Sequence, residues 1–370
     1  MAPSNAFQIA VLPGDGIGPE VMEPCLEVIA AAERKVGGFS CTGTSHPCGA
    51  AHYRDHGEAL PTSTLDACRK ADAILLAAMG LPSVRYPDGT EITPQIDLRI
   101  ELGLYAGVRP VRTMPGLPRV LADPRAENLD FVVIRESTEG LFATKGRGAI
   151  VNDLAATETL VITRGMSERL FDFAFKLARQ RKAKGRPGRV TCVDKANVFT
   201  SFAFFRRIFD ERAALFPDVA KDYAYIDATA LDMVRRPWAM DVLVTENMFG
   251  DILSDLGAGL MGGMGMAPSA DIGDVHAVFQ PCHGTAPDIV GQGKANPTAM
   301  FLSGAMMLEW LGDHHRSAGA QRAGALIEAA VSKAYVERNL KPFELGGPDG
   351  TAAITRAVLE AMDAIDPGSL

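Results

Sequence analysis

The chain has 370 residues, of which 47% are hydrophobic and 22% charged, and its formal net charge is −8. This length is sufficient for two packed domains, and the composition is that of an ordinary globular protein. The acidic balance argues against nucleic acid as the main partner, and no apolar run approaches the ~20 residues that a membrane span needs.

The beginning of the chain and its cysteines bear on the compartment. Residues 1–6 contain no basic segment followed by a long apolar stretch, so we expect no export signal. The six cysteines form no C-x-x-C pair, which argues against a zinc or redox motif. Reduced thiols are typical of a reducing compartment, and we expect a cytoplasmic protein.

Short β-branched runs alternate with longer helical patterns, which predicts an α/β fold. A first strand is predicted at residues 8–12, and a glycine-rich turn then leads into a helix from Pro19 to about Arg34. The turn reads G-x-G-x-G, and no acidic residue follows in a clean second strand, so the Rossmann fingerprint is not met. Two continuous apolar runs predict buried strands, at 73–77 and 131–134.

The same alternation continues to the end of the chain. Two short strands are predicted around Asn152-Asp153 within residues 149–163. Further strands are predicted at 189–193, 223–226 and 242–244. Helices are predicted at 167–182, 199–215, 251–260, 297–311, 318–336 and 351–362.

A pair of acidic residues is the strongest local signal. Asp251 and Asp255 are four residues apart in a predicted helix, so both carboxylates leave the same face. Two like charges in one place are costly unless a cation joins them, and hard oxygen ligands suit Mg²⁺ or Mn²⁺. The alternative interpretation is a helix-capping aspartate beside a solvated one.

Three arginines, Arg99, Arg109 and Arg135, lie beside predicted strands or strand ends. A charge just past a buried strand is where a doubly wound sheet places its ligand. Guanidinium groups bind carboxylates bidentately, so three of them indicate a substrate with at least two carboxylates. Ordinary surface arginines are the alternative interpretation.

Further polar residues follow predicted strands. Lys195, at a strand end, suits proton transfer if its pKa is lowered, and Asp227 is another carboxylate in such a position. A loop of small residues that begins at His283 surrounds one acid, Asp288. A carboxylate there can bind an adenosine ribose hydroxyl, and it repels a 2′-phosphate.

Taken together, these motifs resemble the β-decarboxylating dehydrogenases, a family that contains 3-isopropylmalate, isocitrate, homoisocitrate and tartrate/D-malate dehydrogenases. The resemblance spans residues 8 to about 310 in the same order. The matching motifs are Leu-Pro-Gly-Asp-Gly-Ile-Gly-Pro-Glu (12–20), Leu98-Arg99, Val108-Arg109-Pro110, Arg-Glu-Ser-Thr-Glu-Gly (135–140), Val-Asp-Lys-Ala-Asn-Val (193–198), Asn-Met-Phe-Gly-Asp-Ile-Leu-Ser-Asp (247–255) and His-Gly-Thr-Ala-Pro-Asp-Ile (283–289).

The resemblance implies a role for each matching residue. Lys195 is implied as the proton acceptor at the 2-hydroxyl of the substrate, with Asp227 as a second catalytic residue. The substrate carboxylates are implied to bind Arg99, Arg109 and Arg135. The metal, Mg²⁺ or Mn²⁺, is implied to bind Asp227, Asp251 and Asp255. The cofactor, NAD, is implied to bind His283, Gly284, Thr285, Ala286, Asp288, Ile289 and Asn296.

The resemblance also implies a two-domain α/β fold that is not a Rossmann fold. Residues 1–104 and 262–370 are expected to form a discontinuous cofactor-binding domain, and residues 105–261 a central domain. The implied assembly is a homodimer with shared active sites. Lys195 and Asp227 would then come from the other subunit, and residues 149–163 would form an interface arm.

Some positions depart from the family pattern or fit no single member. Phe142 stands where the family has a tyrosine that gives a proton to the enolate. Thr93 stands where isocitrate enzymes use a serine, whereas Ile92 and Ile96 suit the apolar pocket of isopropylmalate enzymes. Glu246 stands where a neutral residue is more usual.

We therefore expect NAD- and metal-dependent oxidation, with decarboxylation, of a 2-hydroxy diacid of the 3-substituted malate type. The two isoleucines favour 3-isopropylmalate, whereas Thr93 and Gln95 favour an isocitrate-, tartrate- or D-malate-type dehydrogenase. A non-catalytic regulatory subunit with the same fold is the alternative of another class.

Overall fold

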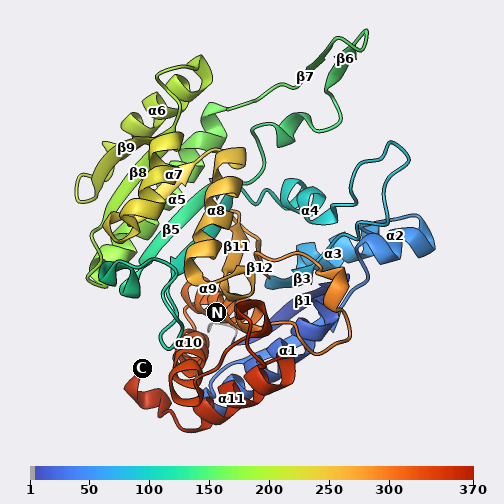
Figure 1. Cartoon of the computed structure of the whole chain (residues 1–370), viewed down its shortest axis with the longest axis vertical. Coiled ribbons are helices and arrows are strands. Elements are labelled where there is room, and N and C mark those ends of the chain that lie inside the picture. Colours follow the sequence, from blue (N-terminus) through green and yellow to red (C-terminus); the bar gives the residue numbers. More distant parts are fainter. Residues whose placement is uncertain (1–4) are drawn as a thin grey trace.

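The computed structural model describes residues 5–370; the first four residues, on which the expectation about an export signal partly rests, lie outside the described part. The centre of the molecule is a ten-stranded mixed sheet (Figure 1). Its strands are, in spatial order, β2 (Ser40–Ser45), β1 (Ala6–Gly14), β3 (Ala73–Ala78), β12 (Ala277–Pro281), β11 (Pro268–Ile272), β4 (Ala106–Arg112), β5 (Asp130–Glu136), β10 (Val242–Thr245), β8 (Arg189–Asp194) and β9 (Ala220–Tyr225).

The sheet has two parallel flanks that meet in an antiparallel middle. The pairs β12–β11, β11–β4 and β4–β5 are antiparallel, and all other neighbours are parallel. The predicted strands β3 and β10 are confirmed and are buried along their whole length, as parallel strands covered on both faces should be. One flank comes from both ends of the chain and the other from its middle.

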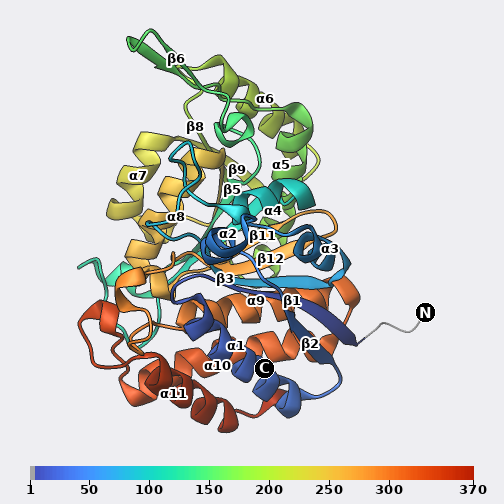
Figure 2. The same ribbon diagram turned by 90° about the vertical axis from the view of Figure 1, so that its right-hand side faces the viewer.

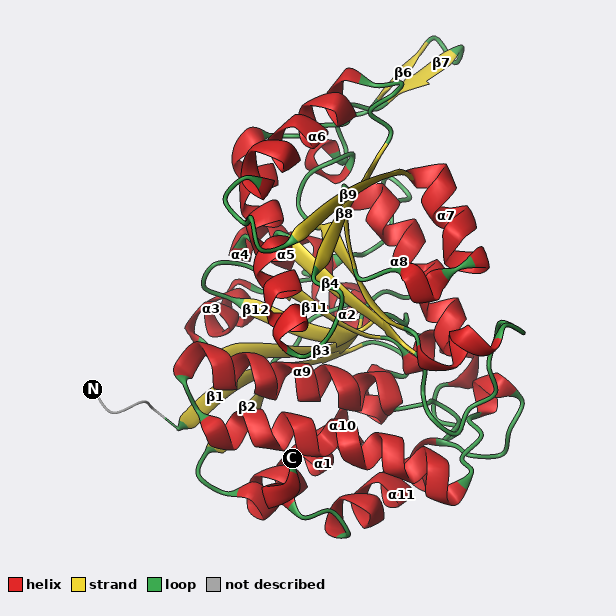
Figure 3. Cartoon of the chain, turned by 90° about the vertical axis from the view of Figure 1, so that its left-hand side faces the viewer, coloured by secondary structure: helices red, strands yellow, loops and turns green. Residues whose placement is uncertain are grey.

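Helices cover both faces of each flank (Figures 2 and 3). The alternation along β1 shows this, since Ile9 and Val11 belong to the core under α1, whereas Ala10 and Leu12 pack with residues of α3 and α4. Around the first flank lie α1 (Gly18–Val36), α2 (Ala50–His56), α3 (Thr62–Lys70), α4 (Pro94–Leu102), α9 (Thr298–His315), α10 (Ala318–Arg338) and α11 (Thr351–Asp363). Around the second lie α5 (Arg164–Ala183), α6 (Thr200–Ala213), α7 (Ile226–Arg235) and α8 (Asn247–Met261).

A two-stranded hairpin stands away from this body (Figure 1). Its strands are β6 (Ala149–Val151) and β7 (Ala155–Thr157), so the predicted pair of strands around Asn152-Asp153 is confirmed. Two of the three turn residues, Asn152 and Asp153, have positive φ, which asparagine and aspartate tolerate better than most residues. Ile150 is 78% and Leu154 88% exposed, so the tip presents apolar side chains that this chain does not cover.

Three local expectations were wrong. The helix that carries Asp251 begins at Asn247, because the Glu246 carboxylate accepts hydrogen bonds from the backbone N–H groups of Met248 and Phe249. Ile226 begins α7 instead of ending a strand, which places Asp227 in the first turn of that helix. Arg99 lies in α4 and not beside a strand.

The mixed α/β class and the absence of a Rossmann fold are confirmed by this sheet order. The expected domain boundaries, 104/105 and 261/262, stay a prediction. β4 belongs to the expected central domain and β11 to the expected cofactor-binding domain, and hydrogen bonds between these strands join both parts in one sheet. None of the helices between residues 5 and 370 has the length and apolarity that a bilayer crossing requires.

Candidate active site

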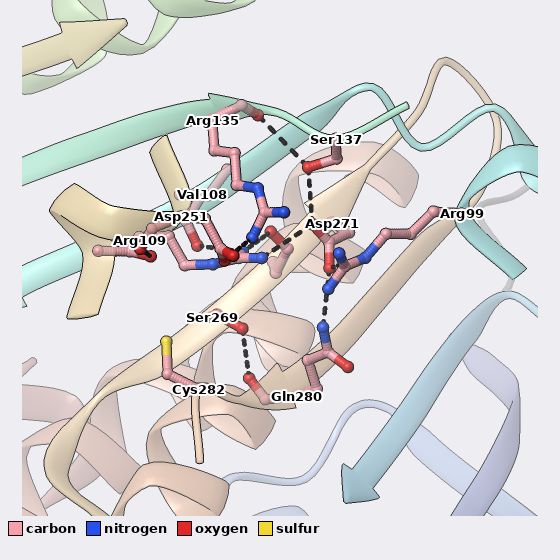
Figure 4. Close-up of polar contacts among 12 residues, drawn as sticks. Arg99, Val108, Arg109, Arg135, Ser137, Asp251, Ser269, Asp271, Gln280 and Cys282 are labelled. Atoms are coloured by element: carbon pink, nitrogen blue, oxygen red, sulfur yellow. Dashed lines mark hydrogen bonds and ion pairs between the residues drawn. The ribbon is translucent and has the colours of Figure 1, made fainter. Parts of the chain in front are cut away.

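The site forms where the two flanks of the sheet meet. Pairing across β5, β4 and β11 places Arg135, Gly107 and Asp271 side by side, and Arg109 follows on the same face of β4. A Cβ atom at Gly107 would lie 2.6 Å from Ser137 Oγ and 3.1 Å from Asp271 Oδ1. Glycine at this position therefore leaves the space in which the polar side chains gather (Figure 4).

A cavity of about 180 Å³ opens above this junction. All three predicted arginines, Arg99, Arg109 and Arg135, line it together with Asp251 and Asp255 from α8. His283 and Gly284 of the predicted cofactor loop line it as well, so the structure brings seven of the sequence-predicted site residues into one place. The other lining residues are Leu76, Ala77, Ala78, Met79, Gln95, Ser254, Ser269, Gln280, Pro281 and Cys282.

The negative charge of Asp251 acts on Asp255, which lies one turn further along α8. Burial and the negative charge of Asp251 together raise the pKa of Asp255. Asp251 forms an ion pair with Arg135, whose Nε and Nη2 also donate to Asn247 Oδ1, at 3.0 and 2.6 Å. Burial and the two neighbouring arginines lower the pKa of Arg135 to about 10. A carboxylate pair of this kind fits a divalent cation, which would remove the repulsion.

The third predicted metal ligand does not join this pair within one chain. Asp227 lies at the start of α7, where its Oδ1 accepts a hydrogen bond from Lys195 Nζ at 2.5 Å. This hydrogen bond lowers the pKa of Asp227. Neither residue lines the cavity, and no group of three His, Cys, Asp or Glu side chains among residues 5–370 is placed to hold a metal ion.

The predicted cofactor loop borders the cavity and the glycine-rich turn. His283 and Gly284 line the cavity, and Gly16 approaches Thr285 so closely that a Cβ there would lie 2.2 Å from its carbonyl oxygen. His283 Nε2 and Gln95 Oε1 are buried atoms without a hydrogen-bond partner, and both residues line the cavity. Such atoms are costly unless a ligand or water pairs with them, which suits a bound cofactor or substrate.

The remaining loop residues lie outside the cavity wall. Asp288 is exposed in a short 3-10 turn, Pro287–Ile289, that follows Ala286. Asn296 is buried, and its amide nitrogen donates to Glu344 Oε1 at 2.7 Å, so this donor is already engaged. Their cofactor roles stay a prediction.

Phe142 lacks the hydroxyl that the family pattern leads us to expect, and two nearby hydroxyls, those of Tyr105 and Thr144, are the candidates to replace it. The Phe142 ring lies 5.4 Å from the Arg135 guanidinium carbon. Tyr105, one alternative donor, is buried and donates its hydroxyl to Asp274 Oδ1 at 3.0 Å. Thr144, the other, donates to the Thr159 carbonyl oxygen at 2.6 Å. Neither residue lines the cavity.

Four residues near position 94 were expected to bear on the choice of substrate, and they do not all face the cavity: Ile92, Thr93, Gln95 and Ile96. Ile92 is fully buried in a small cluster with Ala50 and Ala59. The expectation that it contributes to the wall of the substrate pocket was therefore wrong. Thr93 Oγ1 accepts a hydrogen bond from Lys145 Nζ at 2.7 Å, and Ile96 is half-buried next to Gln95. Only Gln95 of this segment reaches the cavity.

Sequence reasoning missed Asp271. It is fully buried, and its carboxylate forms ion pairs with Arg99 Nε at 3.0 Å and Arg109 Nη2 at 3.1 Å (Figure 4). Burial alone would raise its pKa, but Arg109, Arg99 and Arg135 outweigh burial and lower the pKa to about 2. No motif marked this residue, because its significance depends on partners far away in the sequence.

Comparison with known proteins gives a consistent picture. Residues 8–362 match the family profile described as isocitrate/isopropylmalate dehydrogenase. A 3-isopropylmalate dehydrogenase of Moorella thermoacetica is 43% identical over 338 residues, which is 88% of this chain and 90% of that protein. A 3-isopropylmalate/3-methylmalate dehydrogenase of Methanocaldococcus jannaschii is 38% identical over 340 residues, covering 91% and 96% of the two chains.

Solved structures agree in fold. The crystal structure of isocitrate dehydrogenase from Methylococcus capsulatus superimposes with a TM-score of 0.84 at 36% identity, and the match covers 96% of this chain and 99% of that one. A β-decarboxylating dehydrogenase from Thermococcus kodakarensis gives a TM-score of 0.78 at 37% identity, with 97% and 96% covered. The names of these relatives include both substrate types that the sequence left open.

Proposed function

Because the chain belongs to the isocitrate/isopropylmalate dehydrogenase family, we propose that it oxidises and decarboxylates a 3-substituted malate with NAD⁺ and Mg²⁺ or Mn²⁺. The best candidate substrate is 3-isopropylmalate, the substrate in the names of several relatives. The free thiols of all six cysteines also support the expected cytoplasmic location.

The observation that carries this proposal is the convergence of three guanidinium groups and two carboxylates in one cavity. Arg99, Arg109 and Arg135 offer donors to the carboxylates of a diacid. Asp251 and Asp255 offer oxygen ligands to a divalent cation beside them. A 2-hydroxy diacid bound between the arginines and the aspartates would contact the guanidinium groups and the metal-binding carboxylates at the same time.

The roles of this chain's residues follow from their chemistry. The arginines orient the substrate, so that the hydroxyl points away from them and toward the aspartates. Lys195, which would come from the second subunit, accepts the hydroxyl proton in its neutral amine form, and Asp227 next to it then pairs with the ammonium group that results. Held by Asp251 and Asp255, a divalent cation would supply stabilisation of negative charge on the substrate oxygens, and a dinucleotide at the predicted cofactor loop would supply the hydride acceptor.

The cofactor preference rests on Asp288. Its carboxylate is exposed beside the predicted adenosine site and favours a ribose hydroxyl over a phosphate. We expect NAD⁺ to be preferred over NADP⁺ by at least about tenfold in kcat/KM, or ~1.4 kcal/mol. Equal values for the two cofactors would contradict this assignment.

A second candidate substrate has a specific observation in its favour. The Lys145 ammonium group lies against Thr93, at the position where isocitrate enzymes bind an additional carboxylate. A cation there suits a charged 3-substituent, as in isocitrate, better than an isopropyl group. The half-buried Ile96 on the same segment suits the isopropyl group.

A substrate panel decides between these candidates. NADH formation is followed with Mn²⁺ and each of 3-isopropylmalate, isocitrate, tartrate and D-malate. We expect the highest kcat/KM with 3-isopropylmalate. A preference for isocitrate that Lys145→Met abolishes would select the second candidate. No turnover with any substrate, together with activation of a catalytic relative, would indicate the regulatory-subunit alternative.

A further inference from the structure

Asp271 accepts hydrogen bonds from four side chains at the floor of the site. Its Oδ1 accepts from Arg109 Nη2 and Ser137 Oγ, both at 3.1 Å. Its Oδ2 accepts from Arg99 Nε at 3.0 Å and from Gln280 Nε2 at 2.8 Å. Figure 4 shows the two arginines reaching this carboxylate from different directions. The carboxylate is therefore the common partner of two arginines that belong to different elements.

Asp271 itself does not line the cavity, whereas Arg99, Arg109 and Gln280 do. A buried carboxylate is costly, and only well-placed charged partners compensate for it. Here both partners are groups that also face the proposed substrate. The side chain of Asp271 thus acts on the cavity through the residues that it holds.

We propose that Asp271 is a positioning residue, which fixes Arg99 and Arg109 in the orientation that binds a dicarboxylate. The inference rests on the proposed function for the identity of the substrate. Arg99 comes from a helix and Arg109 from a strand, so nothing in their own backbone ties the two guanidinium groups together. The shared carboxylate supplies that link and leaves the Nη groups of Arg99 for the substrate, whereas Arg109 Nη1 donates to the Val108 and Ala270 carbonyl oxygens.

Replacement by asparagine breaks this arrangement in a defined way. Asparagine has one oxygen, so its amide NH₂ must face two donors, either Arg99 and Gln280 or Arg109 and Ser137. One arginine then loses its hydrogen bond to residue 271, and the loss is greater for Arg99, because Arg109 keeps its bonds to the Val108 and Ala270 carbonyl oxygens. Because the arginines bind the carboxylates in the ground state and in the transition state alike, the loss should appear mainly in KM.

The structure also offers a rescue. Gln280 donates to Asp271, so the double variant Asp271→Asn/Gln280→Glu exchanges amide and carboxylate across one hydrogen bond and keeps one negative charge within this hydrogen-bonded group. Asp274→Asn is a matched control, because Asp274 is exposed on the turn after the same strand and contacts Arg169 and Tyr105 instead.

The experiment measures kcat and KM for 3-isopropylmalate in the full-length enzyme, and the Kd of oxalate, a minimal dicarboxylate, by calorimetry. We expect Asp271→Asn to raise KM and the oxalate Kd by about tenfold or more, with kcat changed less than about threefold. The double variant should recover most of both losses, and Asp274→Asn should match the wild type.

Two results would overturn the proposal. One is an Asp271→Asn enzyme with the KM and oxalate Kd of the wild type. The other is a folded double variant, by its melting curve, in which both constants remain raised; this arm holds even if the single variant does not fold. A wild-type protein that binds oxalate but does not turn over 3-isopropylmalate would count against the proposed substrate alone.

Discussion

At the level of single residues, Phe142 raises the sharpest chemical question. It places an aromatic ring without a hydroxyl beside Arg135, and the hydroxyls of Tyr105 and Thr144 are engaged elsewhere in the chain. Oxidation of the alcohol does not need a proton donor at this position, whereas protonation of the enolate does. Donation by a general acid contributes roughly 10²–10⁴ in rate.

We therefore predict that Phe142→Tyr accelerates the decarboxylation half of the reaction. An enolate that is not protonated can take up CO₂ again, so in the wild type CO₂ should lag behind NADH in a single turnover, or the 2-keto diacid should be released. Both products are quantified in the same quenched samples, with Phe142→Leu as the control that lacks a hydroxyl. Stoichiometric CO₂ at the rate of NADH formation, unchanged by the tyrosine, would show that another donor serves this step.

The carboxylates on α8 lead to a second prediction. Asp251→Asn or Asp255→Asn should weaken Mn²⁺ binding and abolish most activity, because each change removes one formal charge from a hard-cation site. Direct titration of Mn²⁺ by electron paramagnetic resonance gives a readout that is independent of turnover. Asp66→Asn, an exposed carboxylate on α3, serves as the control. Full activity in EDTA would remove the metal from the proposed mechanism.

At the level of elements, α8 is the structure on which the site depends. Its N-terminus is capped by the buried Glu246 carboxylate, which accepts from Met248 N at 3.1 Å and Phe249 N at 2.7 Å. Burial raises the pKa of Glu246, but the two N–H donors oppose this effect. Capping at this point sets where the helix begins and thus which face carries Asp251 and Asp255. The acidic residue that is unusual for the family has a structural purpose here.

We expect Glu246→Ala to lower the free energy of unfolding by about 1–2 kcal/mol, the usual cost of a lost N-cap. Urea denaturation followed by circular dichroism measures the change. Glu23→Ala, at an exposed position inside α1, should stay within about 0.5 kcal/mol of the wild type. An equally stable Glu246→Ala protein would mean that water satisfies the first turn of α8.

At the level of the whole molecule, the proposed site is incomplete in one chain. Lys195 and Asp227 pair with each other away from the cavity that holds Asp251 and Asp255. The β6–β7 hairpin carries exposed apolar side chains, Ile150, Val151 and Leu154, which nothing else within residues 5–370 covers. In a two-fold dimer, each subunit would contribute Lys195 and Asp227 to the cavity of the other, and the two hairpins would cover each other's apolar side chains.

This arrangement predicts complementation between two inactive variants. Lys195→Ala and Asp251→Asn proteins, mixed and allowed to exchange subunits, should regain part of the wild-type activity. A mixed dimer contains one site with both lesions and one site with neither. Each variant alone, treated in the same way, is the control. An active monomer in light scattering would refute the shared site.

Much of this protein can be predicted from local sequence. The apolar runs of β3 and β10, the turn of the β6–β7 hairpin and the spacing of Asp251 and Asp255 are local patterns, and the structure agrees with each. The family motifs likewise singled out the arginines that line the cavity. These features are readable because neighbouring residues alone determine them.

Tertiary structure decided the rest. Asp271 sits in a short strand whose sequence, Pro-Ser-Ala-Asp-Ile, has no marked pattern, and α4 was not expected at all. Only the pairing of β11 with β4, and of β4 with β5, brings Asp271 under Arg109 and beside Ser137. A buried charge is tolerated only where long-range packing supplies its partners, so its role could not be read from the residues next to it in the chain.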